Sequence, residues 1–276
     1  MNEHTSPLSY DAEAAEKFSD KVAGMLNDSA VVLMLSVGHR TGLFATMSAL
    51  SPSTSEVIAE ASELDERYVR EWLAAMTTGG LVDYDPKAKT FQLPPEHAAS
   101  LTAEGALGNL AVYAQFIAMS GAVQDTIIDR FKNGGGVAYA DYPHFHEIMA
   151  EDSGQTVVAQ LFDTILPLAE GMTQRLEAGI DVLDAGCGAG KALIAMAGQF
   201  PKSRFVGYDL SSEAIGRASQ TASALGLDNI EFGARDLTGF DEVARYDLIT
   251  SFDAVHDQKD PQGVLQRLAL ALRPGG

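Results

Sequence analysis

A buried strand that runs into a glycine-rich turn constrains this chain more than any other segment. Residues 181–190 read Asp-Val-Leu-Asp-Ala-Gly-Cys-Gly-Ala-Gly, and a helical stretch follows from Lys191 to Phe200. A strand, a glycine turn and a helix in this order predict the opening unit of a doubly wound parallel α/β sheet, with a ligand over the turn. The glycines Gly186, Gly188 and Gly190 let the backbone approach that ligand closely.

The spacing of these glycines separates three kinds of ligand. A phosphate-binding P-loop requires a glycine five places before Gly190 and Ser or Thr after Lys191, but residues 185 and 192 are alanines. A dinucleotide fingerprint requires its third glycine at position 191 or 193, and neither position holds one. The remaining pattern, Asp-x-Gly-x-Gly-x-Gly, places Asp184 before the first glycine. A carboxylate there favours a positively charged ligand over a pyrophosphate.

Three further strands are predicted after this turn. The strand Arg204–Asp209 ends in an acid about 20 positions beyond the glycines, where a carboxylate can accept hydrogen bonds from both ribose hydroxyls. Because residues 211–224 are helical, Asp209 has the alternative role of a helix N-cap, and the two roles can coexist. Residues 229–232 and 246–252 predict the third and fourth strands, and His256–Asp257 follows the fourth.

The first third of the chain is mainly helical. Residues 53–56, Ser-Thr-Ser-Glu, predict a capping box that opens a short helix, and a second helix from about Asp65 carries its apolar residues at core spacing. Gly79–Gly80 ends this helix, and residues 81–84 and 90–93 flank a turn at Asp85–Lys87, which predicts a hairpin. Two helices followed by a hairpin predict a winged helix, with Trp72 in its core.

The charge of this winged helix disfavours DNA. Residues 54–80 contain six acids and only two bases, and phosphate binding depends on local positive charge. The whole chain has 19 Lys and Arg against 38 Asp and Glu, a net charge of -19. Nucleic acid and anionic membranes are therefore not expected partners. Dimerisation, or covering a site, is the expected role of the domain.

Other features exclude further classes. The longest apolar run, Ala30–Leu35, is far below the ~20 residues that a membrane span needs, and residues 1–18 have no apolar signal core, so we expect a cytoplasmic protein. The single cysteine, Cys187, excludes an intrachain disulfide and a cysteine-based zinc site. Residues 134–146 predict a loop whose aromatic residues, with His144 and His146, are candidates to line a site, and no metal is expected.

The ordered motifs in residues 181–276 resemble the class I methyltransferases that bind S-adenosylmethionine, and a winged helix before them is typical of small-molecule O-methyltransferases. The whole chain also resembles a mycobacterial group of methyltransferase-like transcriptional regulators. This resemblance implies a Rossmann-like sheet, with Asp184 near the cofactor's ammonium group and Asp236 accepting from the adenine amino group. Leu210 and Phe252 complete the expected cofactor contacts, in addition to Asp209 and the three glycines.

In these O-methyltransferases a His-Asp pair after the fourth strand supplies the catalytic base, and His256–Asp257 occupies that place. The family continues with Trp where this chain has Gln258, so the chain departs from the family pattern directly after this pair. The family sheet has seven strands, three of them after the Pro-Gly-Gly turn at which this sequence stops. We therefore expect a C-terminally truncated domain, which lacks part of the substrate pocket.

The predicted organisation is a winged-helix dimerisation domain at 1–100, a helical connector and lid at 101–176, and a cofactor-binding domain at 177–276. The predicted function is methyl transfer from S-adenosylmethionine to a small molecule, at oxygen, by a homodimer. The alternative is a transcriptional regulator that binds the same cofactor with little or no turnover. Neither the acceptor nor its methylated atom follows from the sequence.

Overall fold

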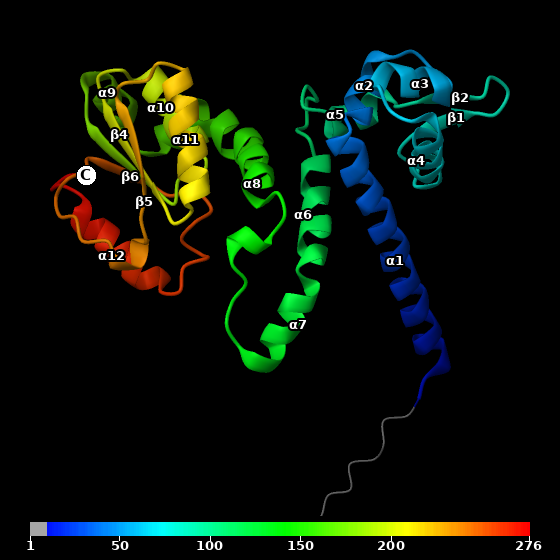
Figure 1. Ribbon diagram of the computed structural model, residues 1–276, viewed down its shortest axis with the longest axis horizontal. Helices are drawn as coiled ribbons and strands as arrows, with labels where there is room; N and C mark the ends of the chain where they lie inside the picture. Colours follow the sequence, from blue (N-terminus) through cyan, green and yellow to red (C-terminus); the bar gives the residue numbers. More distant parts are fainter. Residues whose placement is uncertain (1–9) are drawn as a thin grey trace, which may run out of the picture. The chain divides into compact units, whose positions relative to one another are not determined.

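The computed structural model describes residues 10–276, and the first nine residues of the predicted N-terminal domain lie outside the described residues. The chain divides into two compact units, and the division falls between Tyr142 and Pro143 (Figure 1). This division falls inside the segment 101–176 that the sequence predicts as a single connector. The three predicted domain boundaries remain a prediction.

The N-terminal unit is helical with one hairpin. Its elements are α1 (Ala12–Arg40), α2 (Leu43–Ala49), α3 (Ser55–Ser62), α4 (Glu66–Thr78), β1 (Asp83–Asp85), β2 (Thr90–Gln92), α5 (Pro95–Leu101), α6 (Ala111–Ala122), α7 (Gln124–Asn133) and the short turn η1 (Tyr139–Asp141). The strands pair antiparallel, with Tyr84 opposite Phe91. Helices α3 and α4 followed by this hairpin form the predicted winged helix.

The core of the N-terminal unit forms around α4. Val69, Trp72, Leu73 and Met76 lie three or four residues apart and are all buried, as their spacing predicts. The Trp72 indole N–H donates to the Met34 carbonyl of α1 at 2.8 Å, so this large side chain also satisfies its polar atom. The predicted capping box is wrong, because Thr54 is the N-cap of α3 and makes no side-chain capping bond.

Helix α1 is the one helix within residues 10–276 whose length and composition would let it cross a membrane. Its best 18-residue window has a mean hydropathy of 1.3, and only 11% of that window is buried. A search of the sequence for an uninterrupted apolar run does not detect α1, because small and polar residues separate the apolar residues of this helix.

The C-terminal unit contains a four-stranded parallel sheet in the order β5-β4-β3-β6. Its main elements are α8 (Phe145–Ser153), α9 (Met172–Ala178), β3 (Asp181–Ala185), α10 (Lys191–Gln199), β4 (Arg204–Asp209), α11 (Ser212–Ala224), β5 (Ile230–Ala234), η5 (Leu237–Gly239), β6 (Leu248–Thr250) and α12 (Pro261–Ala271). All four strands predicted from the sequence are present, and their order and direction are those of a Rossmann-like sheet.

Alternating residues of β3 serve the two faces of the sheet. Val182 packs into the cluster that contains Leu193 and Met196 of α10, whereas Leu183 packs into the cluster that contains Val264 and Leu268 of α12. Figure 1 shows α10 and α12 on opposite sides of the strands. Burial on both faces explains why the consecutive residues Val182 and Leu183 are both apolar and fully buried.

The helical stretch predicted from Ser153 to Leu176 is broken. It consists of two π-helical turns, η2 (Gly154–Val158) and η3 (Leu161–Ile165), the 3₁₀ turn η4 (Leu166–Leu168), and α9. Pro167 removes a backbone donor inside this stretch, and Gly171 adopts a left-handed φ of 74° before α9. These two residues account for the interruption between η4 and α9.

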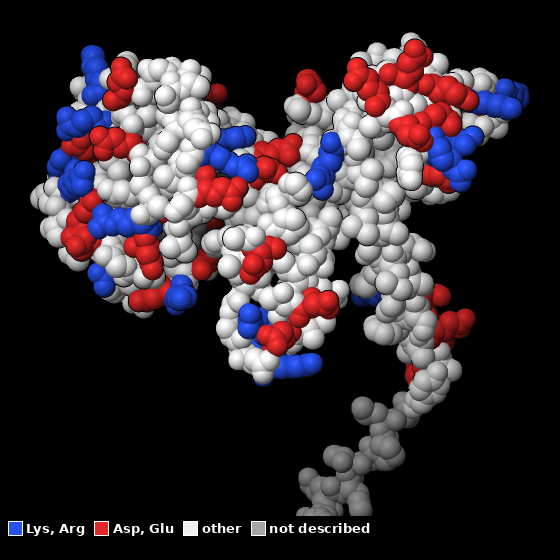
Figure 2. All heavy atoms as spheres, viewed as in Figure 1, with Lys and Arg blue, Asp and Glu red and all other residues white. Residues whose placement is uncertain are grey.

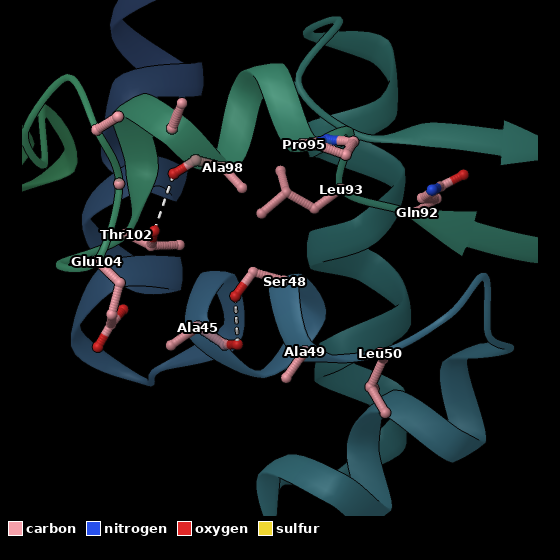
Figure 3. A pocket seen from close by; sticks show the side chains of 13 residues that line it. Ala45, Ser48, Ala49, Leu50, Gln92, Leu93, Pro95, Ala98, Thr102 and Glu104 are labelled. Carbon is pink, nitrogen blue, oxygen red and sulfur yellow. Dashed lines mark hydrogen bonds between the residues drawn. The ribbon is translucent and has the colours of Figure 1, made fainter.

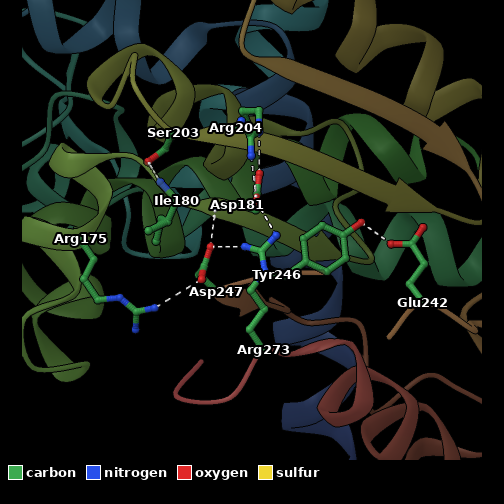
Figure 4. A network of polar contacts seen from close by, with 9 residues as sticks. All are labelled: Arg175, Ile180, Asp181, Ser203, Arg204, Glu242, Tyr246, Asp247 and Arg273. Carbon is green, nitrogen blue, oxygen red and sulfur yellow. Dashed lines mark hydrogen bonds and ion pairs between the residues drawn. The ribbon is translucent and has the colours of Figure 1, made fainter. Parts of the chain in front are cut away.

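Ion pairs tie the amino ends of the strands together (Figure 4). Arg204 of β4 and Arg273 both donate to the carboxylate of Asp181, at 2.7 to 2.9 Å. Arg273 also donates to Asp247 at 2.6 Å, and Asp247 accepts from the Asp181 backbone N–H at 2.9 Å. The hydrogen bonds from Arg204 lower the pKa of Asp181. The network fixes β3, β4 and the start of β6 at the end of the sheet away from the glycine turn.

Candidate functional site

The glycine turn between β3 and α10 has a backbone that favours glycine at three places. Gly186, Gly188 and Gly190 adopt left-handed φ values of 80°, 52° and 71°. A Cβ on Gly186 would lie 2.3 Å from the Ala254 methyl carbon, and one on Gly190 would lie 2.7 Å from the Phe232 ring. A Cβ on Gly188 would meet no atom within 4 Å. Gly186 and Gly190 therefore permit close packing of the protein itself, while Gly188 borders open space that a ligand can enter.

Asp184 is buried at the end of β3. One of its carboxylate oxygens accepts from the Thr250 hydroxyl of β6 at 2.9 Å. Burial is the main cause that raises the pKa of Asp184 to about 7; the Thr250 hydrogen bond opposes this rise, and the nearby charge of Asp209 adds to it. No cationic group among residues 10–276 contacts this carboxylate, so the site favours a positively charged group when Asp184 is ionised.

Asp209 joins the end of β4 to the glycine turn. One carboxylate oxygen accepts from the Gly188 N–H and the other from the Ser211 N–H, both at 2.8 Å. The alternative role of Asp209 as a helix N-cap is wrong, because Ser211 caps α11 through a bond from the Ala214 N–H at 3.2 Å. Each carboxylate oxygen of Asp209 keeps a second lone pair for an added hydroxyl donor.

Asp236 follows β5 and begins the short turn η5. Its Oδ1 accepts from the Thr238 N–H and hydroxyl, both at 2.8 Å, and the bond from the N–H lowers the pKa of Asp236. Its Oδ2 makes no hydrogen bond within residues 10–276. Leu210, which follows Asp209, is 64% exposed. The exposed positions of Asp236 and Leu210 leave both side chains available to a ligand.

The loop after β6 carries the candidate base. The His256 Nε2 and Asp257 Oδ1 lie 3.5 Å apart, and the His256 side chain is 65% exposed. Gln258, which departs from the family pattern, donates from its side chain to the Ala254 carbonyl at 3.1 Å and so folds the loop back on itself. Ala254 is the residue next to Gly186, which brings this loop against the glycine turn. Phe252, before the loop, packs on the core that contains α10.

Sequence reasoning missed several residues that support this site. Thr250 and Ser211 hold the two acids through hydroxyl and backbone bonds, and a lone Thr or Ser in a strand or before a helix gives no specific signal. His146 of α8 lies with its Nε2 2.9 Å from the Ser211 hydroxyl, and His144 pairs with Glu147 at 2.6 Å. The two histidines therefore have separate partners, and no group of three metal-ligating side chains occurs among the described residues.

The N-terminal unit contains a separate pocket of about 740 Å³ between α2, β2 and α5 (Figure 3). Most of its lining consists of small side chains such as Ala45, Ala49 and Ala98. Its two hydroxyls are already engaged, since Ser48 donates to the Ala45 carbonyl and Thr102 to the Ala98 carbonyl. None of the site residues predicted from the sequence lines this pocket.

Comparison with known proteins agrees with this geometry. Residues 29–103 match the family model described as "Rv2258c-like winged HTH domain", and residues 176–276 match that described as "Methyltransferase domain". The tRNA 5-carboxymethoxyuridine methyltransferase of Escherichia coli (strain K12) is 38% identical over 126 residues, which are 44% of this chain and 45% of that protein. The matched regions span only 21%, 42% and 45% of the first three curated relatives.

Two solved structures share the fold along nearly the whole chain. The mitomycin 7-O-methyltransferase MmcR has a TM-score of 0.68 at 18% identity, covering 96% of this chain and 80% of its own. Human N-acetylserotonin methyltransferase in complex with S-adenosylmethionine has a TM-score of 0.66 at 16% identity, covering 98% and 80%. Residues 29–103 therefore match an Rv2258c-like winged helix-turn-helix domain and residues 176–276 match a methyltransferase domain, on a fold that both solved structures share.

Proposed function

We propose that this protein transfers the methyl group of S-adenosylmethionine to a hydroxyl oxygen of a small molecule. The observation that carries the proposal is the glycine turn flanked by two acids. Asp184 is a buried carboxylate that no cationic group in the described part of the chain contacts, and Asp209 accepts from the Gly188 N–H, beside which a Cβ position is open. A ligand with an ammonium group at one end and a ribose beyond it matches this order of groups.

The residues of this chain fit the cofactor in three parts. Asp184, together with Gly186, Gly188 and Gly190, would hold the amino-acid end. Asp209 would accept from the ribose hydroxyls, as its unused lone pairs permit. Asp236 would accept from the adenine amino group through its unengaged Oδ2, with Leu210 and Phe252 as apolar contacts.

The bound cofactor would supply an activated methyl group, so the protein has two tasks. The first is to hold the acceptor oxygen in line with that methyl group. The second is to remove the acceptor proton, and His256 is the candidate general base, with Asp257 beside it to orient the imidazole. A base of this kind contributes typically ~10²- to 10⁴-fold to the rate.

A small molecule, and not DNA, is the proposed partner of the chain. The two bases of α4 are neutralised on their own helix, since Arg67 lies 3.0 Å from Glu71 and Arg70 lies 3.6 Å from Glu66. Figure 2 shows acidic side chains gathered over the part that contains α3, with basic side chains beside them near α4 and at the tip of the hairpin, and residues 54–80 contain six acids against two bases. Such a surface repels a phosphate backbone, which disfavours the regulator alternative. The mitomycin and N-acetylserotonin enzymes share the fold and are named for small-molecule acceptors.

We also propose that the protein is a cytoplasmic homodimer, joined through α1. Phe18, Val22, Met25 and Leu26 lie at helical spacing and are between 37% and 67% exposed, and Leu33 and Val37 continue the stripe. A second copy would cover this stripe more readily than a bilayer, because α1 also carries six charged residues between Glu13 and Asp28. Light scattering should give twice the chain mass for the parent and one chain mass for Leu26→Glu. Flotation of the parent with vesicles would contradict this assignment.

Methyl transfer is tested directly with labelled cofactor. The purified protein is incubated with methyl-labelled S-adenosylmethionine and a panel of phenols and other hydroxyl compounds, and labelled products are separated by chromatography. Product that requires both His256 and Asp209 would support the proposal. Cofactor binding without any product, together with salt-sensitive binding to DNA, would favour the regulator instead.

A further inference from the structure

Glu242 collects hydrogen bonds from three separate segments of the C-terminal unit. Its Oε1 accepts from the Tyr208 hydroxyl of β4 at 3.1 Å, from Arg235 after β5 at 2.7 Å and from Arg245 at 2.9 Å. Its Oε2 accepts from the Tyr246 hydroxyl at 2.6 Å, the contact drawn in Figure 4. The Glu242 side chain is only 14% exposed, so these bonds are poorly replaced by water.

Arg235 connects Glu242 to the end of β4. Its backbone N–H donates to the Asp209 carbonyl at 2.8 Å. Its guanidinium carbon lies 5.2 Å from the centre of the Tyr208 ring and 4.7 Å from that of the Phe240 ring. A planar guanidinium held between two rings and a carboxylate has little freedom to move.

The residue after Arg235 is Asp236, the candidate acceptor for the adenine amino group. The η5 turn that Asp236 begins ends at Phe240, whose ring packs on Arg235. Asp209, the candidate ribose acid, is bonded to Arg235 by its own carbonyl and follows Tyr208 in sequence. Glu242 therefore links Tyr208, the residue before Asp209, to Arg235, the residue before Asp236. Neither Glu242 nor Arg235 is itself one of the two cofactor acids.

We propose that Glu242 and Arg235 are positioning residues that set the separation of Asp209 and Asp236, and that this separation gives the site its preference for adenine. The inference rests on the proposed function, because it assumes that both acids contact the cofactor. It goes beyond that function by assigning base selectivity to a pair that touches no part of the ligand. A displacement of about 1 Å at Asp236 is enough to weaken a hydrogen bond to the base.

A role in folding alone predicts a different pattern from a role in positioning. If the cluster only holds the strands together, its loss lowers stability and weakens every cofactor analogue equally. If it positions Asp236, its loss weakens the ligands that use the adenine amino group and spares those that lack it. The ratio of two affinities separates these cases, since a general loosening cancels in the ratio.

The experiment compares S-adenosylhomocysteine with S-inosylhomocysteine, in which a carbonyl oxygen replaces the amino group. Calorimetry on the full chain should show that the parent prefers the adenine compound by at least ~10-fold, because a carboxylate accepts from an amino group and repels a carbonyl oxygen. We expect Glu242→Gln to bind S-adenosylhomocysteine ~5- to 10-fold more weakly and S-inosylhomocysteine with less than ~2-fold change. Arg235→Lys, which keeps the charge and loses the planar fork, should behave in the same way.

Arg204→Lys is the matched control. It alters a comparable Arg–carboxylate pair at the opposite end of β4, so both affinities should stay at parental values. An unchanged preference in a folded Glu242→Gln or Arg235→Lys variant would overturn the inference. So would loss of the fold in both variants by circular dichroism, because the cluster would then serve stability alone. If the parent binds neither compound, the proposed function has failed, and that result is distinct from a change in preference.

Discussion

Replacing Asp184 by Asn should make the free energy of unfolding less sensitive to rising pH. The same change should weaken cofactor binding. Burial raises the pKa of Asp184 to about 7, above the ~3.9 of an unfolded chain. A raised folded pKa means that the folded state holds the proton more tightly than the unfolded state. The stabilisation that this carboxyl contributes is therefore complete below pH ~4 and is lost as the pH rises through about 7.

The size of this effect follows from the pKa. Between pH 5 and the folded pKa there are about two units, each worth ~1.4 kcal/mol, so the parent should lose roughly 3 kcal/mol between pH 5 and pH 8.5 from this group alone. Asn carries no charge at either pH and should abolish that loss. Acids whose pKa is lowered, such as Asp181 and Glu242, make the free energy of unfolding rise with pH instead. Their contribution is the same in parent and variant, so it cancels when the two are compared.

Urea unfolding at the two pH values measures the difference. Far-ultraviolet circular dichroism follows both units, whereas the fluorescence of Trp72, the single tryptophan, reports on the N-terminal unit. The variant should also bind S-adenosylhomocysteine at least ~10-fold more weakly, because a charged partner of the ammonium group is removed. Equal pH slopes in parent and variant would refute the reasoning about burial. Equal cofactor affinity would refute the role of Asp184 as the ammonium partner.

Four further predictions follow from the site. Gly188→Ala should fold, at a cost of ~1 to 2 kcal/mol from its left-handed φ, and should lose cofactor affinity. Gly186→Ala should unfold more readily, because its added methyl group meets Ala254. Thermal unfolding and calorimetry on both variants separate the effect on stability from the effect on binding. Asp209→Ala should weaken cofactor binding by roughly 1 to 3 kcal/mol, and Ser211→Ala, which removes the helix cap and the contact with His146, should affect binding less; circular dichroism confirms that both fold. His256→Ala should lower turnover by at least ~10²-fold with nearly unchanged cofactor affinity, and undiminished turnover would make this histidine a structural residue. The winged helix should give no gel shift with DNA at physiological salt, and a shift at nanomolar protein that disappears as salt rises would contradict this.

Local patterns in the sequence indicated most of the helices and strands, although not the break between Ser153 and Leu176. The alternation of apolar residues and the positions of glycine predicted β3, β4 and the winged helix, because these patterns reflect local geometry and burial. The order of strand, glycine turn and helix predicted the fold class, and the spacing of Gly186, Gly188 and Gly190 after Asp184 carried the family resemblance that implied the cofactor. Local chemistry alone specifies such a turn, since few other residues adopt its φ values.

The contacts around these residues became visible only in the folded structure. In the structure Ser211, and not Asp209, caps α11, so the Asp209 side chain is available for another role. Which residue caps a helix depends on the angle at which the chain enters it. The structure also showed that Gln258 folds the His256 loop onto Ala254, a contact that a departure from a motif cannot reveal. The bonds of Glu242 join residues up to 34 positions apart. Such contacts arise when the strands assemble, so no local pattern in the sequence predicts them.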